Sequence, residues 1–178
     1  MRRKYLGDSY DLVKRTFAGA LGPIAPLYAH PQFVPADIRA DYTVITAIPI
    51  LGSRPAGEFG LLLDPHTGVP LPTARTQRPT PSYAPVGFIA SLAEELRPTY
   101  LICFDQSYHR RPGFGSAAQR EAKRRALEER KICSFHYVSH APFLFAATVS
   151  DILLEVRGRL RDLGIPESRL ESSDDPAI

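Results

Sequence analysis

Hydrophobic and polar positions follow two alternating patterns along the chain, one typical of strands and one typical of helices. Continuous apolar runs, which predict buried strands, occupy 42–50, 59–63, 99–104, 132–138 and 143–147. Apolar residues at helical spacing, which predict helices, occupy 8–21, 89–96, 116–130 and 152–163. Buried strands that alternate with helices indicate an α/β fold. We therefore predict a Rossmann-like three-layer sandwich with a mostly parallel sheet.

Residues at the ends of the predicted helices support these boundaries. Asp8 or Ser9 can cap the first helix, because short polar side chains accept hydrogen bonds from the first free backbone N–H groups. Ser116 and Gln119 have the spacing of a capping box at the start of the charged helix. Gly164 follows the last helix, where a left-handed residue commonly ends a helix.

Proline is the most unusual feature of the composition. The chain has 17 prolines in 178 residues, about twice the usual share of roughly 5%. Six of them lie between Pro65 and Pro85, which excludes a central strand or a continuous helix there. We predict a long loop over 65–85, either a substrate-binding arm or a mobile connector. The chain length predicts one α/β domain over 1–170, followed by an acidic, flexible tail over 171–178.

The composition also limits the class of protein. Hydrophobic residues make up 44% and charged residues 23% of the chain, which is enough to form a core and unlike a disordered protein. No apolar run approaches the roughly 18 residues of a membrane span, so we predict no membrane partner. The basic start 1–4 leads into Gly7-Asp8 rather than an apolar segment, which predicts a cytoplasmic protein without a secretory signal. Cys103 and Cys133 lack CxxC spacing, which favours reduced, buried thiols.

Two predicted strands end directly in an aspartate. Asp64 follows 61–63, and Asp105 follows 101–104. Ligands of open parallel sheets bind outside the carboxyl ends of the strands, so the two carboxylates are expected to face one cleft if the strands are neighbours. Such a pair can hold Mg²⁺, which needs only one or two protein carboxylates. The alternative is that each aspartate caps the turn that follows it.

A third acidic group lies in the segment GDSYDLVK at 7–14. Asp8 and Asp11 are three positions apart, so one can cap a helix while the other complements the positive end of its dipole. Asp11 and Lys14 share a helical face, and a lysine beside carboxylates is also typical of a site that stabilises phosphoryl charge. Both interpretations are open.

The positive charge of the chain is concentrated between 106 and 131. This segment has a net charge of +5, from eight basic residues and three glutamates, whereas the whole chain has +3, so the remainder has −2. Its basic residues are Arg110, Arg111, Arg120, Lys123, Arg124, Arg125, Arg130 and Lys131. Arg120, Lys123 and Arg124 share one helical face and are expected to attract phosphate. The alternative is that these charges form only a solvated helix surface. Tyr108 and Phe114 lie among the arginines, where aromatic rings can stack on bases.

Histidines mark the end of the strand predicted at 132–138. His136 and His140 share a face with Val138, because strand side chains alternate. Histidine acts as a general base or metal ligand near neutral pH, but two histidines alone do not specify a metal. The alternative is a hydrogen-bonded pair with a structural role. Ser107 and Ser139 lack the GxSxG pattern of a hydrolase nucleophile.

Three motifs together resemble a known group of proteins: GDSYDLVK at 7–14, LLLDPHTG at 61–68 and FDQSYHR at 104–110. Uncharacterised bacterial and phage α/β proteins have an early GDxxDxxK helix, a strand ending in LDPDTG or LDPDNG, and a later strand ending in a polar motif with an arginine. The resemblance implies a candidate site made of Asp8, Asp11, Lys14, Asp64, Thr67, Gly68 and Arg110. His66 stands where the group has a second acid, and no established activity comes with the resemblance.

The strand that ends in Asp64-Pro65 is also similar to the (D/N)PP(Y/F) motif of nucleic-acid amino-methyltransferases. His66 and Thr67 replace the second proline and the aromatic residue of that motif. No GxGxxG-like loop follows an early strand to hold a cofactor. This resemblance implies a methyltransferase-like protein that has lost cofactor binding.

The leading functional hypothesis is a metal-assisted phosphoesterase, nuclease-like, that acts on a nucleic acid or nucleotide. In this hypothesis Asp64 and Asp105 bind Mg²⁺, Lys14 contacts phosphate, and His140 or His136 activates water. The expected substrate-binding residues are Asp8, Asp11, Thr67, Gly68, Arg110, Arg111, Arg120 and Arg124. The alternatives are a methyltransferase-like protein and a non-catalytic module that binds nucleic acid or protein. The oligomeric state is left open.

Overall fold

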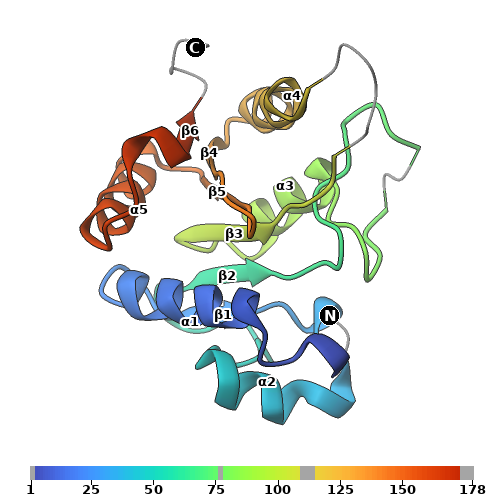
Figure 1. The fold of residues 1–178 in the computed structure, drawn as a ribbon, viewed down its shortest axis with the longest axis vertical. Helices are drawn as coiled ribbons and strands as arrows, with labels where there is room; N and C mark the ends of the chain where they lie inside the picture. Colours follow the sequence, from blue (N-terminus) through green and yellow to red (C-terminus); the bar gives the residue numbers. More distant parts are fainter. Residues whose placement is uncertain (1–2, 76–77, 109–114, 173–178) are drawn as a thin grey trace.

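The computed structural model of the protein describes residues 3–75, 78–108 and 115–172, which form an α/β fold around one mixed sheet (Figure 1). The strands are β1 (Leu27–Ala29), β2 (Gly60–Leu63), β3 (Tyr100–Phe104), β4 (Cys133–Tyr137), β5 (Phe143–Ala147) and β6 (Leu170–Ser172). The α-helices are α1 (Ser9–Leu21), α2 (Arg39–Thr46), α3 (Val86–Glu95), α4 (Ser116–Glu128) and α5 (Ser150–Asp162).

The sheet has the strand order β1-β2-β3-β5-β4-β6. The pairs β1–β2 and β2–β3 are parallel, whereas β3–β5, β5–β4 and β4–β6 are antiparallel. The prediction of a mostly parallel sheet is therefore wrong for the second half of the chain. The reason is the short connection 138–142 between β4 and β5, because a return over so few residues produces an antiparallel pair, and a parallel pair needs a longer crossover.

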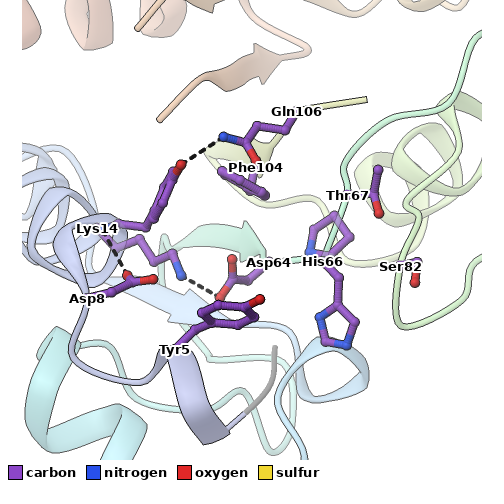
Figure 2. A pocket seen from close by; sticks show the side chains of 11 residues that line it. Tyr5, Asp8, Lys14, Asp64, His66, Thr67, Ser82, Phe104 and Gln106 are labelled. Atoms are coloured by element: carbon purple, nitrogen blue, oxygen red, sulfur yellow. Dashed lines mark hydrogen bonds and ion pairs between the residues drawn. The ribbon is translucent and has the colours of Figure 1, made fainter. Parts of the chain in front are cut away.

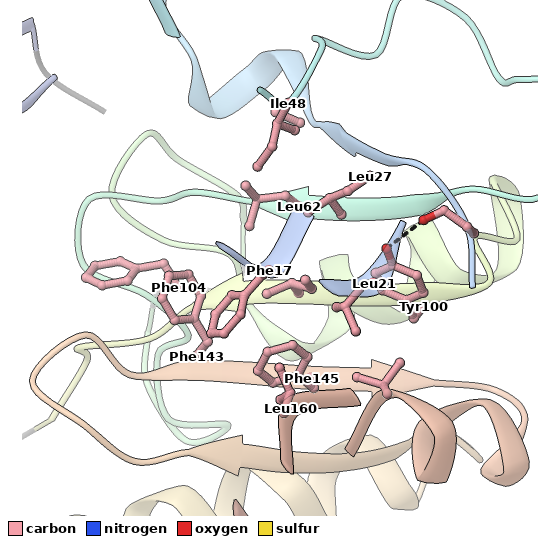
Figure 3. Packing of buried hydrophobic residues seen from close by; sticks show 14 of the residues in the cluster. Phe17, Leu21, Leu27, Ile48, Leu62, Tyr100, Phe104, Phe143, Phe145 and Leu160 are labelled. Carbon is pink, nitrogen blue, oxygen red and sulfur yellow. Dashed lines mark hydrogen bonds between the residues drawn. The ribbon is translucent and has the colours of Figure 1, made fainter. Parts of the chain in front are cut away.

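Helices cover both faces of the sheet. On one face, α1, α2 and α5 pack against side chains that include Leu62 and Ile102. Figure 3 shows the centre of this core, where the ring of Phe17 meets the edges of Phe143 and Phe145 at centroid distances of 5.3 Å. On the other face, α3 and α4 pack over residues of β2, β3 and β5, and the two helices contact each other. Each strand of the sheet centre is thus buried on both sides.

The register between β2 and β3 decides where the two strand-end aspartates point. Leu63 pairs with Cys103, so Asp64 is level with Phe104 and Asp105 lies one residue further along. Successive side chains of a strand point to opposite faces. Asp64 therefore lies on the face of Phe104 and α1, whereas Asp105 lies on the face of Cys103 and α4.

The element predictions are confirmed for β2, β3, β4 and β5 and for α1, α3, α4 and α5. The strand predicted over 42–50 is wrong, because this segment begins inside α2. Its residues have β-propensity, but Tyr42 and Thr46 are four positions apart and both are buried, as in a helix that packs on a core. Ala47, with φ of 58°, ends the helix. The three-residue strands β1 and β6 were not predicted, because so short a run carries no periodicity.

The helix-end predictions had mixed outcomes. Asp8 caps α1 and accepts hydrogen bonds from the backbone N–H groups of Tyr10 and Asp11. The capping box at the start of α4 is wrong, because the N-cap is Gly115 and no side chain caps this end. Gly164 follows α5 with φ of 85°, as predicted.

The segments predicted as loop and tail also differ in outcome. The described part of 65–85 contains no helix or strand and only isolated bridges, such as Gly68 with Tyr83. The predicted tail is wrong at its start, because Glu171 and Ser172 belong to β6 and pair with β4. The rest of the tail, 173–178, lies outside the described residues.

Two further features concern the described residues as a whole. None of their helices combines the length and the apolar character that a bilayer crossing requires. Cys103 and Cys133 are both free thiols, Cys103 buried and Cys133 partly buried.

We predict that Gly68→Ala strongly destabilises the fold. Gly68 has φ of 130°, and an added Cβ would lie 2.5 Å from Oδ1 and 2.6 Å from Cα of Asp105. Backbone strain and this collision together should lower the free energy of unfolding by about 3 kcal/mol, measured by urea denaturation. The control is Gly158→Ala in α5, where no atom lies within 4 Å of the added Cβ. It should stabilise the protein by about 0.5–1 kcal/mol, and equal effects of the two variants would contradict this explanation.

Candidate active site

A cleft of about 430 Å³ lies at the carboxyl ends of β2 and β3, beside the beginning of α1 (Figure 2). Asp8 reaches it from the N-cap of α1, Lys14 from the second turn of α1, Asp64 from the end of β2, and His66 and Thr67 from the loop that follows. The opposite wall contains aromatic and amide side chains described below. This position is where open parallel sheets bind their ligands.

Lys14 forms the centre of the cleft floor. Its ammonium donates to Asp11 Oδ1 at 2.9 Å and to Asp64 Oδ2 at 2.6 Å, and only 3% of Lys14 and 5% of Asp64 are exposed. Burial alone would lower the pKa of Lys14, but the charges of Asp64 and Asp11 reverse this effect and raise the pKa above its usual value. Lys14 is therefore a fixed cation and does not act as a base at neutral pH.

The cluster of Asp11, Lys14 and Asp64 holds two carboxylates and one ammonium, an excess of one negative charge. Burial raises the pKa of Asp11, although Lys14 and the N–H of Gly7, which donates to Asp11 Oδ2 at 2.8 Å, act in the opposite direction. Buried charge that is not fully compensated attracts a proton or a cation. This excess distinguishes the cleft floor from the buried cluster around Asp105, in which each carboxylate has a cation.

Tyr42 of α2 lies behind the ammonium of Lys14, which is 5.7 Å from the centre of the Tyr42 ring. The side chain is completely buried, and its hydroxyl forms no hydrogen bond of good geometry with the described residues. Burial, and then the charges of Asp64 and Asp11, hold the pKa of Tyr42 well above its usual value. The phenol therefore stays protonated, and its O–H can still donate.

Hydrogen bonds join α1, the residues after β3 and the connection between β4 and β5 into the wall opposite the floor. The Gln106 amide donates to the Tyr10 hydroxyl and to the His140 carbonyl, both at 2.9 Å. The Tyr10 ring also meets the ring of Phe104 edge-on at 5.5 Å. On the loop side, Thr67 donates its N–H to the carbonyl of Ser82 at 2.9 Å, and its own carbonyl accepts from the N–H of Gln106. The cleft thus has one rigid aromatic side and one side built from the proline-rich loop.

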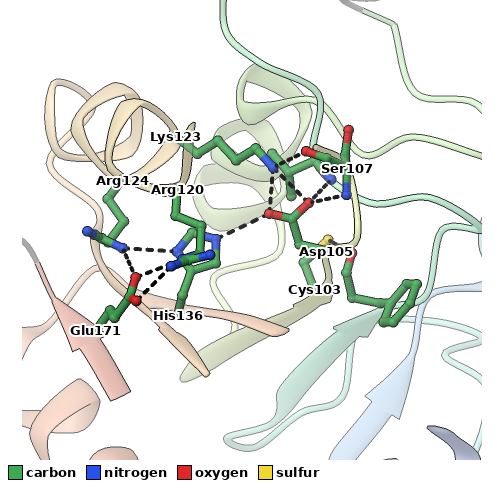
Figure 4. Close-up of polar contacts among 10 residues, drawn as sticks. Cys103, Asp105, Ser107, Arg120, Lys123, Arg124, His136 and Glu171 are labelled. Atoms are coloured by element: carbon green, nitrogen blue, oxygen red, sulfur yellow. Dashed lines mark hydrogen bonds and ion pairs between the residues drawn. The ribbon is translucent and has the colours of Figure 1, made fainter. Parts of the chain in front are cut away.

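Asp105 belongs to a separate buried cluster on the other face of the sheet (Figure 4). The Lys123 ammonium donates to both oxygens of Asp105, at 2.9 and 2.8 Å, and to the Ser107 carbonyl at 2.8 Å. The backbone N–H groups of Val69 and Ser107 also donate to Asp105 Oδ1. Although burial would raise the pKa of Asp105, Lys123 and His136 hold it below its usual value.

His136 is held in its neutral form within this second cluster. Its Nδ1 faces the guanidinium of Arg124 at 3.4 Å, and its Nε2 lies 3.2 Å from Asp105 Oδ2. Arg124 can only donate, so Nδ1 must accept and Nε2 must carry the proton that is donated to Asp105. Complete burial, which the neighbouring Asp105 opposes, lowers the pKa of His136 to about 4.

The remaining cations of this cluster have carboxylate partners as well. Arg120 forms two hydrogen bonds of 2.7 Å with Glu171, and Arg124 pairs with Glu121 at 2.6 Å. With Lys123 on Asp105, three buried cations face three carboxylates, and the exposed Arg125 also pairs with Glu121, so each carboxylate of this cluster has a cation. The prediction that this face of α4 attracts phosphate is wrong for Arg120 and Arg124, because both are buried and paired within the protein.

The structure brings together five of the predicted site residues around the first cleft: Asp8, Asp11, Lys14, Asp64 and Thr67. It places Gly68 against Asp105. The proposed pairing of Asp64 with Asp105 is not seen, because each carboxylate faces its own lysine on its own face of the sheet. The side chain of His140 is exposed, but its ring lies 5.4 Å from the ring of Tyr10, and its carbonyl accepts from Gln106 in the cleft wall. Arg110 and Arg111 lie outside the described residues.

Some cleft residues were not predicted as site residues. Tyr10, Ser82 and Gln106 line the cleft, and His66 was noted only as a departure from a motif. Tyr10 and Gln106 are next in sequence to predicted site residues, so their position in the sequence could have pointed to them. Ser82 reaches the cleft only because the proline-rich loop returns there. Among the described residues, no group of three His, Cys, Asp or Glu side chains is arranged to hold a metal ion.

Comparisons with protein-family models, curated protein sequences and solved structures give no match to this chain.

We predict that the protein loses stability as the pH falls from about 6.5 toward 4. The unfolded chain binds a proton at His136 with a pKa near 6.5, whereas native His136 binds one only near pH 4. Below pH 6.5 the unfolded state therefore binds more protons than the native state. The free energy of unfolding should fall by about 3 kcal/mol by the time the pH reaches about 4. Urea denaturation at several pH values measures this loss.

The variant His136→Gln should flatten this pH dependence, and the exposed-site control His140→Gln should leave it unchanged. If His136→Gln and the natural protein lose stability in parallel between pH 6.5 and 4, neutral His136 is not the cause.

Proposed function

We propose that the protein hydrolyses phosphoester bonds of a nucleotide or nucleic acid in the cleft at the carboxyl ends of β2 and β3, assisted by a divalent cation at Asp64. The observation that carries this proposal is the excess negative charge of Asp11, Lys14 and Asp64 at the floor of an open cleft. In the balanced cluster around Asp105, no such charge is left to attract a ligand.

The carboxylates of the cleft fit Mg²⁺ or Mn²⁺, which prefer oxygen ligands, better than Zn²⁺ or Cu²⁺, which prefer nitrogen or sulfur ligands. Asp64 accepts the Lys14 ammonium at Oδ2, and its carboxylate lines the cleft. Asp8 lines the same cleft and uses Oδ1 for its capping bonds. Mg²⁺ commonly binds one or two carboxylates and completes its shell with water and substrate phosphate. A bound divalent ion would polarise the phosphoryl oxygens.

The rest of the cleft supports a substrate of nucleotide size. Its volume of about 430 Å³ lies within the usual range of roughly 300–1,000 Å³ for small-molecule sites. Phe104 and Tyr5 provide ring surfaces in the lining. The N–H groups of Tyr10 and Asp11 in the first turn of α1 already donate to Asp8, so substrate phosphate would depend on Lys14 and the cation for charge compensation.

The chain's own residues would then have distinct roles. In the reaction the oxygen of a water molecule bonds to phosphorus, the ester P–O bond breaks, and the leaving oxygen takes up a proton. His66 lines the cleft and is the histidine we assign to accept the proton of the water, in place of His140 or His136. Lys14, held as a cation, stabilises the negative charge that develops on the phosphoryl group. Asp105 has a structural role in this scheme.

The assignment of the fold as Rossmann-like is part of the same proposal. It is supported by the parallel strands β1, β2 and β3 and by a cleft at the carboxyl ends of two of them. No observation favours the methyltransferase alternative, and β1 leads into His30-Pro31 rather than into a glycine-rich turn.

The test compares Asp64→Asn with Asp105→Asn. Asp64→Asn leaves Lys14 paired with Asp11 and removes the excess charge, so the protein should stay folded while Mg²⁺- or Mn²⁺-dependent hydrolysis of bis-p-nitrophenyl phosphate falls about 100-fold or more. Asp105→Asn breaks a buried ion pair, so its free energy of unfolding should fall by about 3–5 kcal/mol. The folded fraction of Asp105→Asn should keep its activity within a few-fold.

Thermal unfolding and steady-state kinetics of both variants measure these effects. Metal-dependent activity that survives in Asp64→Asn would end the proposal. Salt-sensitive binding of an oligonucleotide without any turnover in the natural protein would favour the non-catalytic binding module instead.

A further inference from the structure

A groove of about 820 Å³ lies at the opposite ends of the strands from the cleft. Its lining comes from α3, from Arg97 and Pro98 between α3 and β3, and from 130–132 between α4 and β4. It therefore lies at the amino ends of β3 and β4, whereas the cleft lies at the carboxyl end of β3. Its basic lining residues are Arg97, Arg130 and Lys131, and all three are exposed. Glu94 is the acidic residue of the lining, so the groove carries an excess of two positive charges.

Two of these cations have a backbone conformation that favours glycine. Arg97 has φ of 51° and Lys131 has φ of 60°, both in the left-handed region. Residues with a Cβ are uncommon there, and glycine is the usual residue just after a helix. The chain therefore keeps two long basic side chains at positions where glycine would be more stable. Departures from a local rule of this kind are typical of functional sites.

The negative ends of the two helix dipoles do not explain these residues. The Leu96 carbonyl at the end of α3 accepts from Arg54 Nε at 2.8 Å, and the Ala126 carbonyl of α4 accepts from Arg130 at 2.7 Å. Each helix end thus already has a cation. The side chains of Arg97 and Lys131 have no hydrogen bond or ion pair with the described residues, so their charges are available to a ligand.

We propose that this groove binds a compact phosphorylated anion, with a small polyphosphate group between Arg97, Arg130 and Lys131. Guanidinium and ammonium groups bind phosphate oxygens by charge-assisted hydrogen bonds. The positive surface is short, because Glu94 and Glu95 of α3 and the exposed Glu128 of α4 adjoin it. A nucleic acid strand that passed through the groove would meet all three acids, whereas a small anion would share the groove with Glu94 alone. This inference is independent of the function proposed for the cleft.

The experiment measures binding of inorganic pyrophosphate by isothermal titration calorimetry in EDTA, so that no divalent ion takes part. The double variant Arg97→Gly and Lys131→Gly should bind pyrophosphate about tenfold or more weakly than the natural protein. Each substitution also relieves the left-handed backbone, so the Tm should rise by about 2–4 °C per site. A loss of binding together with a gain in stability cannot come from damage to the fold.

The control is Arg125→Ala, which removes another exposed cation of α4 that pairs with Glu121 and lies outside the groove. This variant should bind pyrophosphate as the natural protein does. Pyrophosphate binding that is unchanged in the double variant, or lost equally in Arg125→Ala, overturns the proposal. So does tight, salt-sensitive binding of a single-stranded oligonucleotide with no binding of pyrophosphate, because the partner would then be a nucleic acid.

Discussion

The ammonium of Lys14, buried between Asp11 and Asp64, is the interaction on which the account of this protein depends. It binds Asp11 of α1 and Asp64 at the end of β2, and so it joins the helix to a central strand. The two carboxylates carry one more charge than the ammonium can neutralise. A structural ion pair at this position would need only one aspartate. The excess charge lies at the floor of an open cleft, where the parallel half of the sheet ends. A cation is the simplest partner that such a floor can accept.

The one-residue offset between the two strand-end aspartates divides the buried polar groups into two clusters. Since strand side chains alternate, a single step along β3 moves a carboxylate from the face of α1 to the face of α4. On that second face Asp105 is neutralised by Lys123 and accepts a hydrogen bond from neutral His136, and these contacts attach α4 to the sheet. One cluster is thus compensated and holds the fold together, and the other is uncompensated and open to a ligand.

Local features were predictable from the sequence, and features that depend on distant partners were not. Asp8 as the cap of α1, and the strands that lead to Asp64 and Asp105, follow from short-range pattern. The register between β2 and β3, which separates the two aspartates, is a property of the pairing and leaves no mark in either strand alone. The buried Arg120 of α4 illustrates the same limit, because its partner Glu171 belongs to β6, 51 residues further along the chain. Charge composition alone indicated an exposed basic surface there.

The most direct measurement of the central claim is anomalous diffraction from a crystal soaked in Mn²⁺. We expect a manganese peak in the cleft, bonded to a carboxylate oxygen of Asp64 and displaced when Mg²⁺ is added in excess. A peak bonded to Asp105, or an Asp64 carboxylate that contacts only Lys14 at saturating Mn²⁺, would contradict it.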